Sequence, residues 1–215
     1  MLTVISQKND LNQHGDFMDN LENNYVDYFE QFNIKLLIIP NTTKNIDFYF
    51  KKFPIERIIL SGGNDIDPEA YGQKKRGNLS LAKLRDKTEK RLLTIALQKK
   101  LPVLGICRGM QFINVFFKGK LINLKHHVAC NHPIQIDRWG GIKVNSYHNQ
   151  GMNEQVLSPK LKSFAQSPDR IIEGIYHPNL PLAGIQWHPE RKSPDKKINA
   201  KLINAFLKNK LFWQK

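Results

Sequence analysis

Short, continuous apolar runs alternate with longer amphipathic segments along most of this chain. The run 36–39 ends at Pro40, and the run 103–106 follows Pro102. Runs of this length without polar alternation are typical of strands buried on both faces, as in a parallel sheet. The predicted strands are 3–5, 35–39, 57–60, 103–106 and 184–187, and the predicted helices are 23–32, 85–100 and 196–212.

This alternation predicts an α/β fold with three layers, in which a mostly parallel central sheet has helices on both faces. Residues 120–145 carry shorter β-like pieces, which predict a small antiparallel part. At 215 residues the chain fits one domain, 1–215, since the prior is roughly 150 residues per domain. No apolar run reaches the roughly 18 residues of a membrane span, so we expect no membrane association.

The net charge of +14 is the compositional feature that most suggests a polyanionic partner. Of the 33 basic residues, 25 are Lys, and they are scattered along the chain without an arginine-rich block. Nucleic-acid binding is therefore not expected, and the alternatives are a solvated surface and attraction of a small anionic substrate. The 2 cysteines cannot build a disulfide framework, and one lies in a motif that needs a free thiol. We therefore expect a reducing, cytoplasmic setting.

The strand 103–106 is followed by the pattern G-x-C-x-G, formed by Gly105, Cys107 and Gly109, and then by a helix that begins near Met110. A sharp strand-to-helix turn of this kind exposes a nucleophile at the end of the strand. The helix directs its N-terminal dipole at the cysteine, which favours the thiolate. Cys107 is therefore the candidate nucleophile, and the alternative is a buried structural cysteine.

A histidine and a carboxylate follow another apolar strand near the end of the chain. His188 comes directly after the strand 184–187, and Glu190 comes two residues later, beyond Pro189. A cysteine nucleophile needs a base, and the base needs a group that orients it. Since active crevices of open α/β sheets lie at the carboxyl ends of the strands, His188 and Glu190 are expected beside the cysteine.

Adjacent glycines follow the strand 57–60. Gly62 and Gly63 let backbone N–H groups point into the crevice, where the Gly63 and Arg108 N–H groups together would bind an oxyanion. The alternative is an ordinary tight turn. Three such elements, each at the carboxyl end of a strand, indicate an acyl-transfer site.

The motifs together resemble the class I glutamine amidotransferase superfamily, and more narrowly its stand-alone γ-glutamyl hydrolases. The resemblance extends from about residue 3 to the closing helix. The stretches that carry it are 61–72 (SGGNDIDPEAYG), 85–89 (RDKTE), 105–111 (GICRGMQ), 144–150 (VNSYHNQ) and 186–190 (QWHPE). It implies the flavodoxin-like sheet of that superfamily, with the antiparallel part near the site.

The resemblance also implies roles for single residues. Cys107 attacks the γ-carbonyl of a γ-glutamyl amide and forms a glutamyl thioester, while His188 acts as base and then as acid. Glu190 orients His188, and the N–H groups of Gly63 and Arg108 form the oxyanion hole. The residues expected to contact the glutamyl group are Gly62, Gln111, Ser146, Tyr147 and His148.

The implied partner is a small-molecule γ-glutamyl conjugate, with no cofactor and no metal, and a homodimer is left open. The leaving group is either nucleotide-linked, as in the γ-glutamyl-CDP-amidate of capsule phosphoramidate biosynthesis, or an aminobutyrate or polyamine amine. One alternative is a glutaminase subunit that delivers ammonia to a separate synthetase. Another is a non-catalytic relative that binds a partner, which the intact set of Cys107, His188 and Glu190 disfavours.

Two groups of charged residues have more than one interpretation. Asp86 and Glu89 either cap the helix 85–100 or form an ion-paired scaffold under the elbow, the strand-to-helix turn that carries Cys107. The run Lys74, Lys75 and Arg76 is either a solvated loop or a contact to an anionic leaving group.

A cluster of possible metal ligands lies between residues 126 and 132. His126, His127, Cys130 and His132 have a spacing that matches no common structural zinc site. We therefore predict no metal there, although one of these histidines is a candidate for facing the substrate.

Overall fold

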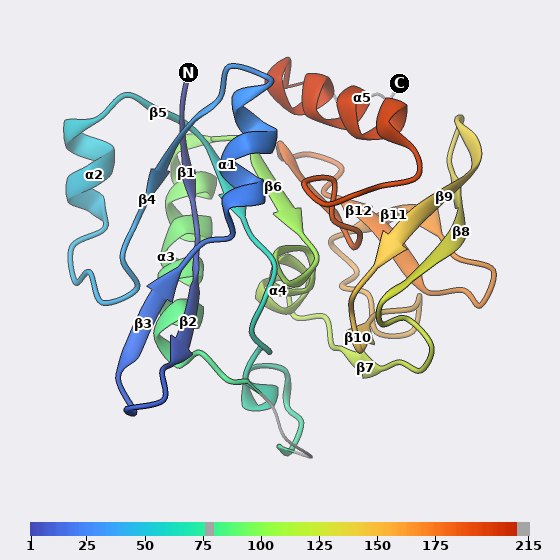
Figure 1. Ribbon diagram of the computed structural model, residues 1–215, viewed down its shortest axis with the longest axis horizontal. Helices are drawn as coiled ribbons and strands as arrows, with labels where there is room; N and C mark the ends of the chain where they lie inside the picture. The colour runs from blue at the N-terminus through green and yellow to red at the C-terminus, as the bar shows by residue number, and fades with distance from the viewer. Residues whose placement is uncertain (76–79, 210–215) are drawn as a thin grey trace.

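The computed structural model describes residues 1–75 and 80–209. Its main feature is a nine-stranded sheet in the order β4-β1-β5-β6-β13-β12-β11-β8-β9 (Figure 1). These strands are β1 (Leu2–Ile5), β4 (Lys35–Ile38), β5 (Ile55–Leu60), β6 (Val103–Ile106), β8 (Cys130–Ile136), β9 (Gly140–Ser146), β11 (Lys162–Gln166), β12 (Ile172–Tyr176) and β13 (Leu182–Ile185).

The sheet changes direction at β13. The pairs from β4 to β13 are parallel, and the pairs from β13 through β12, β11 and β8 to β9 are antiparallel. Two further sheets have two strands each: the hairpin of β2 (Lys8–Leu11) with β3 (Phe17–Asn20), and the pair of β7 (Ile122–Asn123) with β10 (Gln150–Gly151). The antiparallel part predicted from 120–145 therefore lies largely in the main sheet and lengthens it.

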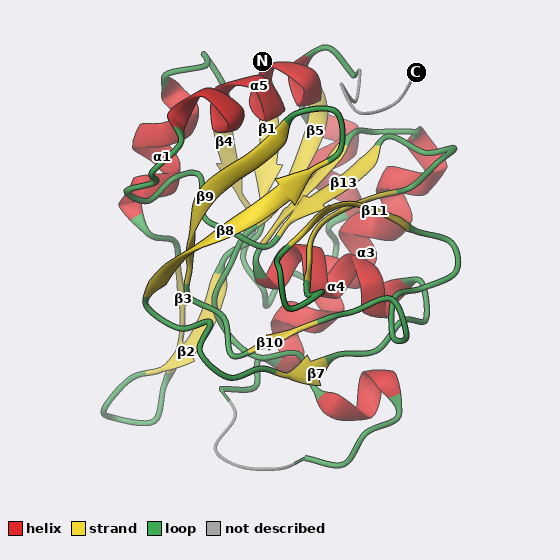
Figure 2. Cartoon of the chain, turned by 90° about the vertical axis from the view of Figure 1, so that its right-hand side faces the viewer, coloured by secondary structure: helices red, strands yellow, loops and turns green. Residues whose placement is uncertain are grey.

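Helices cover both faces of the sheet (Figure 2). They are α1 (Asn23–Glu30), α2 (Asp47–Lys52), α3 (Lys83–Lys99), α4 (Arg108–Phe116) and α5 (Lys196–Leu207), with one 3-10 turn, η1 (Pro68–Tyr71). Strand residues alternate between the two apolar clusters, since Ile58 and Leu60 pack with α3 and α4, whereas Ile59 packs with α1 and α5. The alternation explains why the strands are apolar without interruption, and it confirms the predicted fold class.

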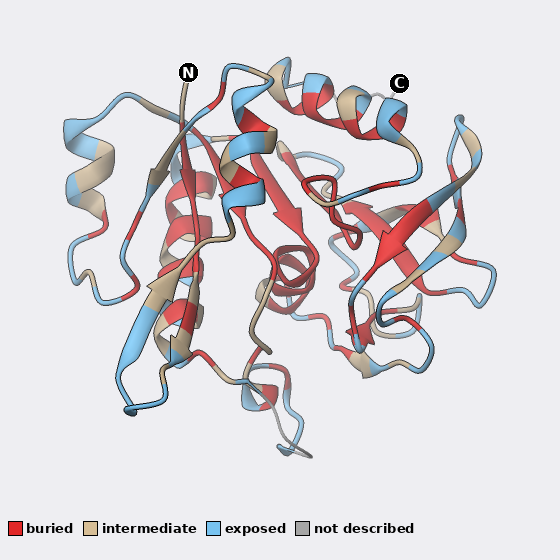
Figure 3. Ribbon diagram, in the orientation of Figure 1, coloured by how far each residue is buried: buried red, intermediate tan, exposed pale blue. Residues whose placement is uncertain are grey.

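The carboxyl ends of β5, β6 and β13 meet at one edge of the sheet. Leu60 pairs with Gly105, and Ile106 pairs with Ile185, so the segments that follow these three strands lie side by side. Both β6 and α4 are buried almost throughout (Figure 3). The site is thus built on the most buried part of the fold, which holds its geometry rigidly.

The structure differs from the sequence-based expectations in a few elements. The β2–β3 hairpin and α2 were not predicted, and α4 begins at Arg108 rather than near Met110. The closing helix ends at Leu207, and residues 210–212 of the predicted helix lie outside the described residues. Among the described helices, none is long and apolar enough to cross a membrane.

Candidate active site

Cys107 occupies a strained turn between β6 and α4. Its φ of 52° and ψ of −105° are unusual for a residue with a side chain, and its N–H donates to the Ile185 carbonyl at 2.8 Å. The turn depends on both flanking glycines. A Cβ on Gly109 would come within 2.1 Å of the Leu60 carbonyl oxygen, and one on Gly105 within 2.6 Å of Gly109. The G-x-C-x-G pattern therefore reflects close contact between the elbow and its neighbours.

His188 is fixed from two directions. Its Nδ1 lies 2.5 Å from Glu190 Oε1, and its ring is buried. Its backbone N–H donates to Asn145 Oδ1 at 2.9 Å, and its carbonyl accepts from Asn145 Nδ2 at 2.8 Å. With Nδ1 held by Glu190, the other ring nitrogen is left for the cysteine and a substrate.

The mutual electrostatic effects of Cys107, His188 and Glu190 favour a thiolate on Cys107 and an imidazolium on His188. Burial raises the pKa of Cys107, but the adjacent His188 outweighs it and lowers that pKa below its ordinary value of 9.0. Burial lowers the pKa of His188, but Cys107 and Glu190 together raise it to about 10. The Gln186 amide also donates to the sulfur at 3.6 Å. The structure thus brings Cys107, His188 and Glu190 together, in an arrangement that is chemically able to activate a nucleophile and to position a base beside it.

The two residues predicted to supply the oxyanion hole, Gly63 and Arg108, line the same pocket as Cys107. Gly63 has a φ of 92°. The Arg108 N–H is the first amide of α4, so no helical carbonyl accepts from it. Two such donors aimed at a reacting carbonyl would stabilise the charge of a tetrahedral intermediate, and the oxyanion hole stays a prediction.

Gly62 has a different position from the one expected of a substrate contact. Its N–H donates to the Tyr25 hydroxyl at 2.9 Å, and a Cβ there would come within 2.7 Å of His188 Cε1. Burial, followed by the Glu190 carboxylate, raises the pKa of Tyr25 well above its ordinary value. The protonated phenol therefore lies beside Glu190, and the absence of a side chain at Gly62 lets His188 approach the elbow.

A buried ion network lies under the elbow. Glu89 is fully buried, and its carboxylate pairs with Arg85 Nε at 2.8 Å and with the Arg108 guanidinium. Arg108 also pairs with Asp86, and Arg85 donates to the Gly62 carbonyl at 2.8 Å. Of the two interpretations of Asp86 and Glu89, the structure supports the ion-paired scaffold. It joins α3, the elbow and the turn at Gly62 and Gly63.

Removing Glu89 is expected to destabilise the fold strongly. Glu89→Ala leaves Arg85 and Arg108 as buried charges without their shared partner, so the free energy of unfolding should fall by about 3–5 kcal/mol in urea denaturation. The matched control is Glu30→Ala, which breaks an exposed pair with Lys35. Its effect should stay below about 1 kcal/mol. Equal effects of the two variants would contradict a structural role for the network.

The pH dependence of that stability follows from the same network. Burial raises the pKa of Glu89, but Arg108 and Arg85 outweigh it and lower that pKa below its ordinary value of 4.5. A group with a lowered folded-state pKa contributes its full stability above its unfolded-state pKa. That contribution is lost as the pH falls through the folded-state pKa.

A pocket of about 200 Å³ opens over the sulfur. Of four further residues predicted to bind the substrate, three line this pocket and one does not. Gln111, Tyr147 and His148 line the pocket together with Cys107 and His188. Ser146 is buried away from it and donates its hydroxyl to the His127 carbonyl at 2.5 Å.

Several residues that shape the site were not singled out from the sequence. Tyr25 and Asn145 hold Glu190 and His188 as described above, and Arg191 lies 4.6 Å from the centre of the Tyr147 ring. Arg191 is held by a bidentate pair with Glu22. The polar stretch 144–150 was a signal for Asn145, but no local pattern points to Tyr25, which comes from α1.

Solved structures with the same fold include glutamine amidotransferases. A glutamine amidotransferase from Thermotoga maritima superposes with a TM-score of 0.60 over 96% of this chain and 83% of its own, at 16% identity. A candidate GMP synthase component from Thermoplasma acidophilum gives a TM-score of 0.69 over 97% and 94% of the two chains, at 19% identity. The fold is therefore that of a class I glutamine amidotransferase.

The sequence comparisons identify the family, which the shared fold alone does not. Residues 2–190 match the model of the peptidase C26 family, so the chain belongs to that family. It is 34% identical over 148 residues to the γ-glutamyl-CDP-amidate hydrolase of Campylobacter jejuni, which covers 69% of this chain and 68% of that protein. It is 28% identical over 184 residues to the γ-glutamyl-γ-aminobutyrate hydrolase PuuD of Escherichia coli K12, covering 71% of each chain. Both findings confirm the resemblance seen in the motifs and support a hydrolase.

Proposed function

We propose that this chain hydrolyses a γ-glutamyl amide through a glutamyl thioester on Cys107. The thiolate attacks the γ-carbonyl carbon, and the Gly63 and Arg108 N–H groups hold the oxyanion. The His188 imidazolium then gives its proton to the leaving nitrogen. With His188 now neutral, a water molecule loses a proton to it and attacks the thioester, which releases glutamate and restores the thiolate.

The observation that carries this proposal is the assembly of the three side chains at one edge of the sheet. The pKa of Cys107 is lowered and that of His188 is raised, which is the pairing that nucleophilic and acid–base steps at one centre require. The amide substrate is supported by the relatives, which are named as hydrolases of γ-glutamyl conjugates. A free thiol at this position also fits a reducing, cytoplasmic compartment.

The experiment that tests the proposal is a hydrolysis screen of γ-glutamyl conjugates with glutamate as the readout. The panel contains γ-glutamyl-CDP-amidate, γ-glutamyl-γ-aminobutyrate, a γ-glutamyl polyamine and free glutamine. Glutamate release from at least one conjugate, faster than from glutamine, supports the hydrolase. Ammonia release from glutamine alone would favour the alternative, a glutaminase subunit that supplies a separate synthetase.

Among these conjugates, the nucleotide-linked one has a specific structural argument. Lys74 lines a second pocket of about 420 Å³, together with Tyr71 and Gln150. The Gln150 carbonyl accepts from Gln111 Nε2 at 2.8 Å, and Gln111 lines the pocket over Cys107. A leaving group that extends from the sulfur past Gln111 and Gln150 would therefore approach the Lys74 ammonium group, which favours a phosphate-bearing group and a role in capsule biosynthesis.

Neutral substitutions at Lys74 and the adjacent Lys75 should distinguish charged from uncharged substrates. The variant Lys74→Gln with Lys75→Gln is expected to raise KM for the anionic conjugate by about 1.5–5-fold per lysine, the value of an exposed ion pair. Added salt should have a similar effect, because exposed charges are screened over roughly 8–10 Å. Arg76, the third member of the run, lies outside the described residues.

A small neutral γ-glutamyl amide serves as the internal control, because it uses only the pocket over Cys107. Its KM should stay unchanged in the double variant. Equal changes for both substrates would mean that the substitutions disturb the segment after Gly63 rather than a contact to the leaving group. No change for either substrate would assign the two lysines to a solvated loop.

A further inference from the structure

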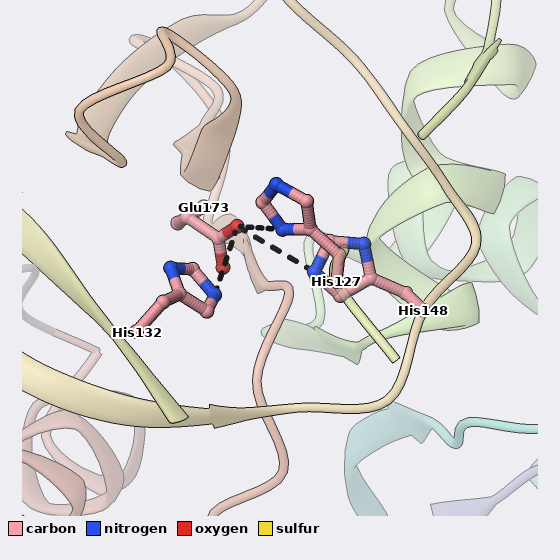
Figure 4. A group of neighbouring side chains, drawn as sticks. All are labelled: His127, His132, His148 and Glu173. Carbon is pink, nitrogen blue, oxygen red and sulfur yellow. Dashed lines mark ion pairs between the residues drawn. The ribbon is translucent and has the colours of Figure 1, made fainter. Parts of the chain in front are cut away.

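Three histidines and a glutamate that are far apart in sequence converge beside the pocket (Figure 4). His132 lies on β8 and Glu173 on β12, whereas His127 precedes β8 and His148 follows β9. One side-chain atom of each residue lies within 4.8 Å of the others. This set differs from the one considered in the sequence, since Cys130 is not part of it and its thiol donates to the His126 carbonyl at 3.4 Å.

The atoms that face one another in this cluster have no hydrogen bonds. Among the described residues, no hydrogen-bond partner exists for His127 Nδ1, His132 Nε2, His148 Nε2 or either Glu173 oxygen. Glu173 is fully buried. A buried carboxylate and three buried imidazole nitrogens without hydrogen bonds are costly in a folded protein, and the three nitrogens share only one carboxylate oxygen as an ion-pair partner. A cation bound between them would satisfy all four groups.

The opposite nitrogen of each ring does have a partner. His127 Nε2 lies 2.9 Å from Asp169 Oδ2, His148 Nδ1 lies 3.0 Å from the Gln150 carbonyl, and His132 Nδ1 lies 3.3 Å from the Pro133 carbonyl. Since these partners are acceptors, they favour the tautomer in which the outer nitrogen carries the proton. In a neutral ring of that tautomer, the inner nitrogen presents a lone pair toward Glu173. Metal-binding histidines have this arrangement, in which an outer carboxylate or carbonyl fixes the tautomer.

We propose that His127, His132, His148 and Glu173 bind one divalent transition-metal ion of the zinc class. Glu173 Oε1 lies 3.5 Å from His148 Nε2, 3.6 Å from His132 Nε2 and 3.9 Å from His127 Nδ1. Ligand atoms of a tetrahedral zinc ion with bonds of about 2.0–2.1 Å are roughly 3.3 Å apart. The three distances to Glu173 exceed that separation by a few tenths of an ångström, and all four atoms lie within 4.8 Å of one another. Three imidazoles exclude magnesium and calcium, which prefer oxygen ligands.

Four protein ligands, three of them in buried residues and one in the partly buried His132, define a closed, structural site rather than a catalytic one. The ion would join β8 and β12 to the segment after β9. That segment contains Tyr147 and His148, which form one wall of the pocket over Cys107. The metal thus holds the pocket wall in place and takes no part in the hydrolytic steps.

Cobalt binding to the metal-free protein tests the site directly, because four-coordinate Co²⁺ has characteristic visible absorption. We expect one Co²⁺ per chain, displacement of it by Zn²⁺, and a higher melting temperature with either ion. His132→Ala and Glu173→Gln should abolish both the absorption and the rise in melting temperature. Cys130→Ser and His126→Asn are the matched controls, and binding should be unchanged in both.

A third variant removes a supporting group without touching a ligand. Asp169 is largely exposed, so Asp169→Asn should fold normally. It should weaken Co²⁺ binding by about 10–100-fold, the usual effect of losing an outer partner of a ligating histidine. Binding that persists in Glu173→Gln and His132→Ala, or is lost in Cys130→Ser, would place the ion elsewhere and overturn the proposal. Failure of the wild-type protein to bind Co²⁺ stoichiometrically near neutral pH would overturn it as well, and would assign the cluster to a proton shared between His148 and Glu173.

Discussion

Replacing Cys107 with serine is expected to reduce glutamate release from a γ-glutamyl conjugate by roughly 10⁴–10⁶-fold, the effect of removing the nucleophile from a catalytic triad. The hydroxyl of serine has a far higher pKa than a thiol, so the adjacent His188 cannot hold it as an anion. The strained turn and its two glycines remain in this variant. The loss therefore reports the chemistry of the sulfur and not the fold of the elbow.

The second cysteine provides the control. Cys130→Ser should keep most of the activity, because Cys130 lies on β8, its thiol donates to the His126 carbonyl, and it is not among the residues that line the pocket over Cys107. In the wild-type protein, a glutamyl adduct should be trapped on Cys107 by acid quenching and located by peptide mass spectrometry. Retained activity in Cys107→Ser, or an adduct on Cys130 alone, would contradict the assignment of the nucleophile.

The sequence predicts the parallel half of the sheet well, because strands buried on both faces have continuous apolar runs that are easily recognised. The strands from β4 to β13 have continuous apolar runs, and Pro40 and Pro102 mark the boundaries of two of them. The β2–β3 hairpin has no such run, since its strands are short and mostly polar. It is held by contacts distant in sequence, such as the Asn64 amide to Asp10 at 2.7 Å. Such contacts leave no periodicity for a local pattern to detect.

The same distinction applies to the site. Cys107 directly follows β6, and His188 and Glu190 lie within five residues of the end of β13, so the rule that parallel strands end at one edge predicts that they meet. Asn145 and Glu173 reach the site through antiparallel strands, whose register is set by the whole sheet. The four residues of the proposed metal site come from four segments. The local spacing of His126, His127, Cys130 and His132 matched no common zinc site, so the sequence predicted no metal there. Only the folded chain brings His148 and Glu173 to that point.

Replacing His188 with asparagine is expected to lower turnover by roughly 10²–10⁴-fold, since both proton transfers depend on the imidazole. It should also change the chemistry of the sulfur. Without the imidazolium, burial and the Glu190 charge raise the pKa of the Cys107 thiol and only His148 still lowers it, so that pKa should rise relative to the wild-type protein. Alkylation of Cys107 by iodoacetamide, measured against pH, should therefore become rapid only at higher pH in this variant. Near-normal turnover with an unchanged alkylation profile would indicate that a base other than His188 acts.

A conservative change at Glu190 separates orientation from proton transfer. Glu190→Gln keeps a hydrogen-bond partner for His188 Nδ1 but removes the charge, so its effect on turnover should be smaller than that of His188→Asn. The pKa of His188, raised to about 10 by Cys107 and Glu190 against the effect of burial, should fall in this variant. Activity that needs the imidazolium as proton donor is lost as the pH rises through that pKa, so the alkaline limb of kcat/KM should move to lower pH. An alkaline limb that stays in place would mean that Glu190 does not stabilise the imidazolium, and that the 2.5 Å contact only positions the ring.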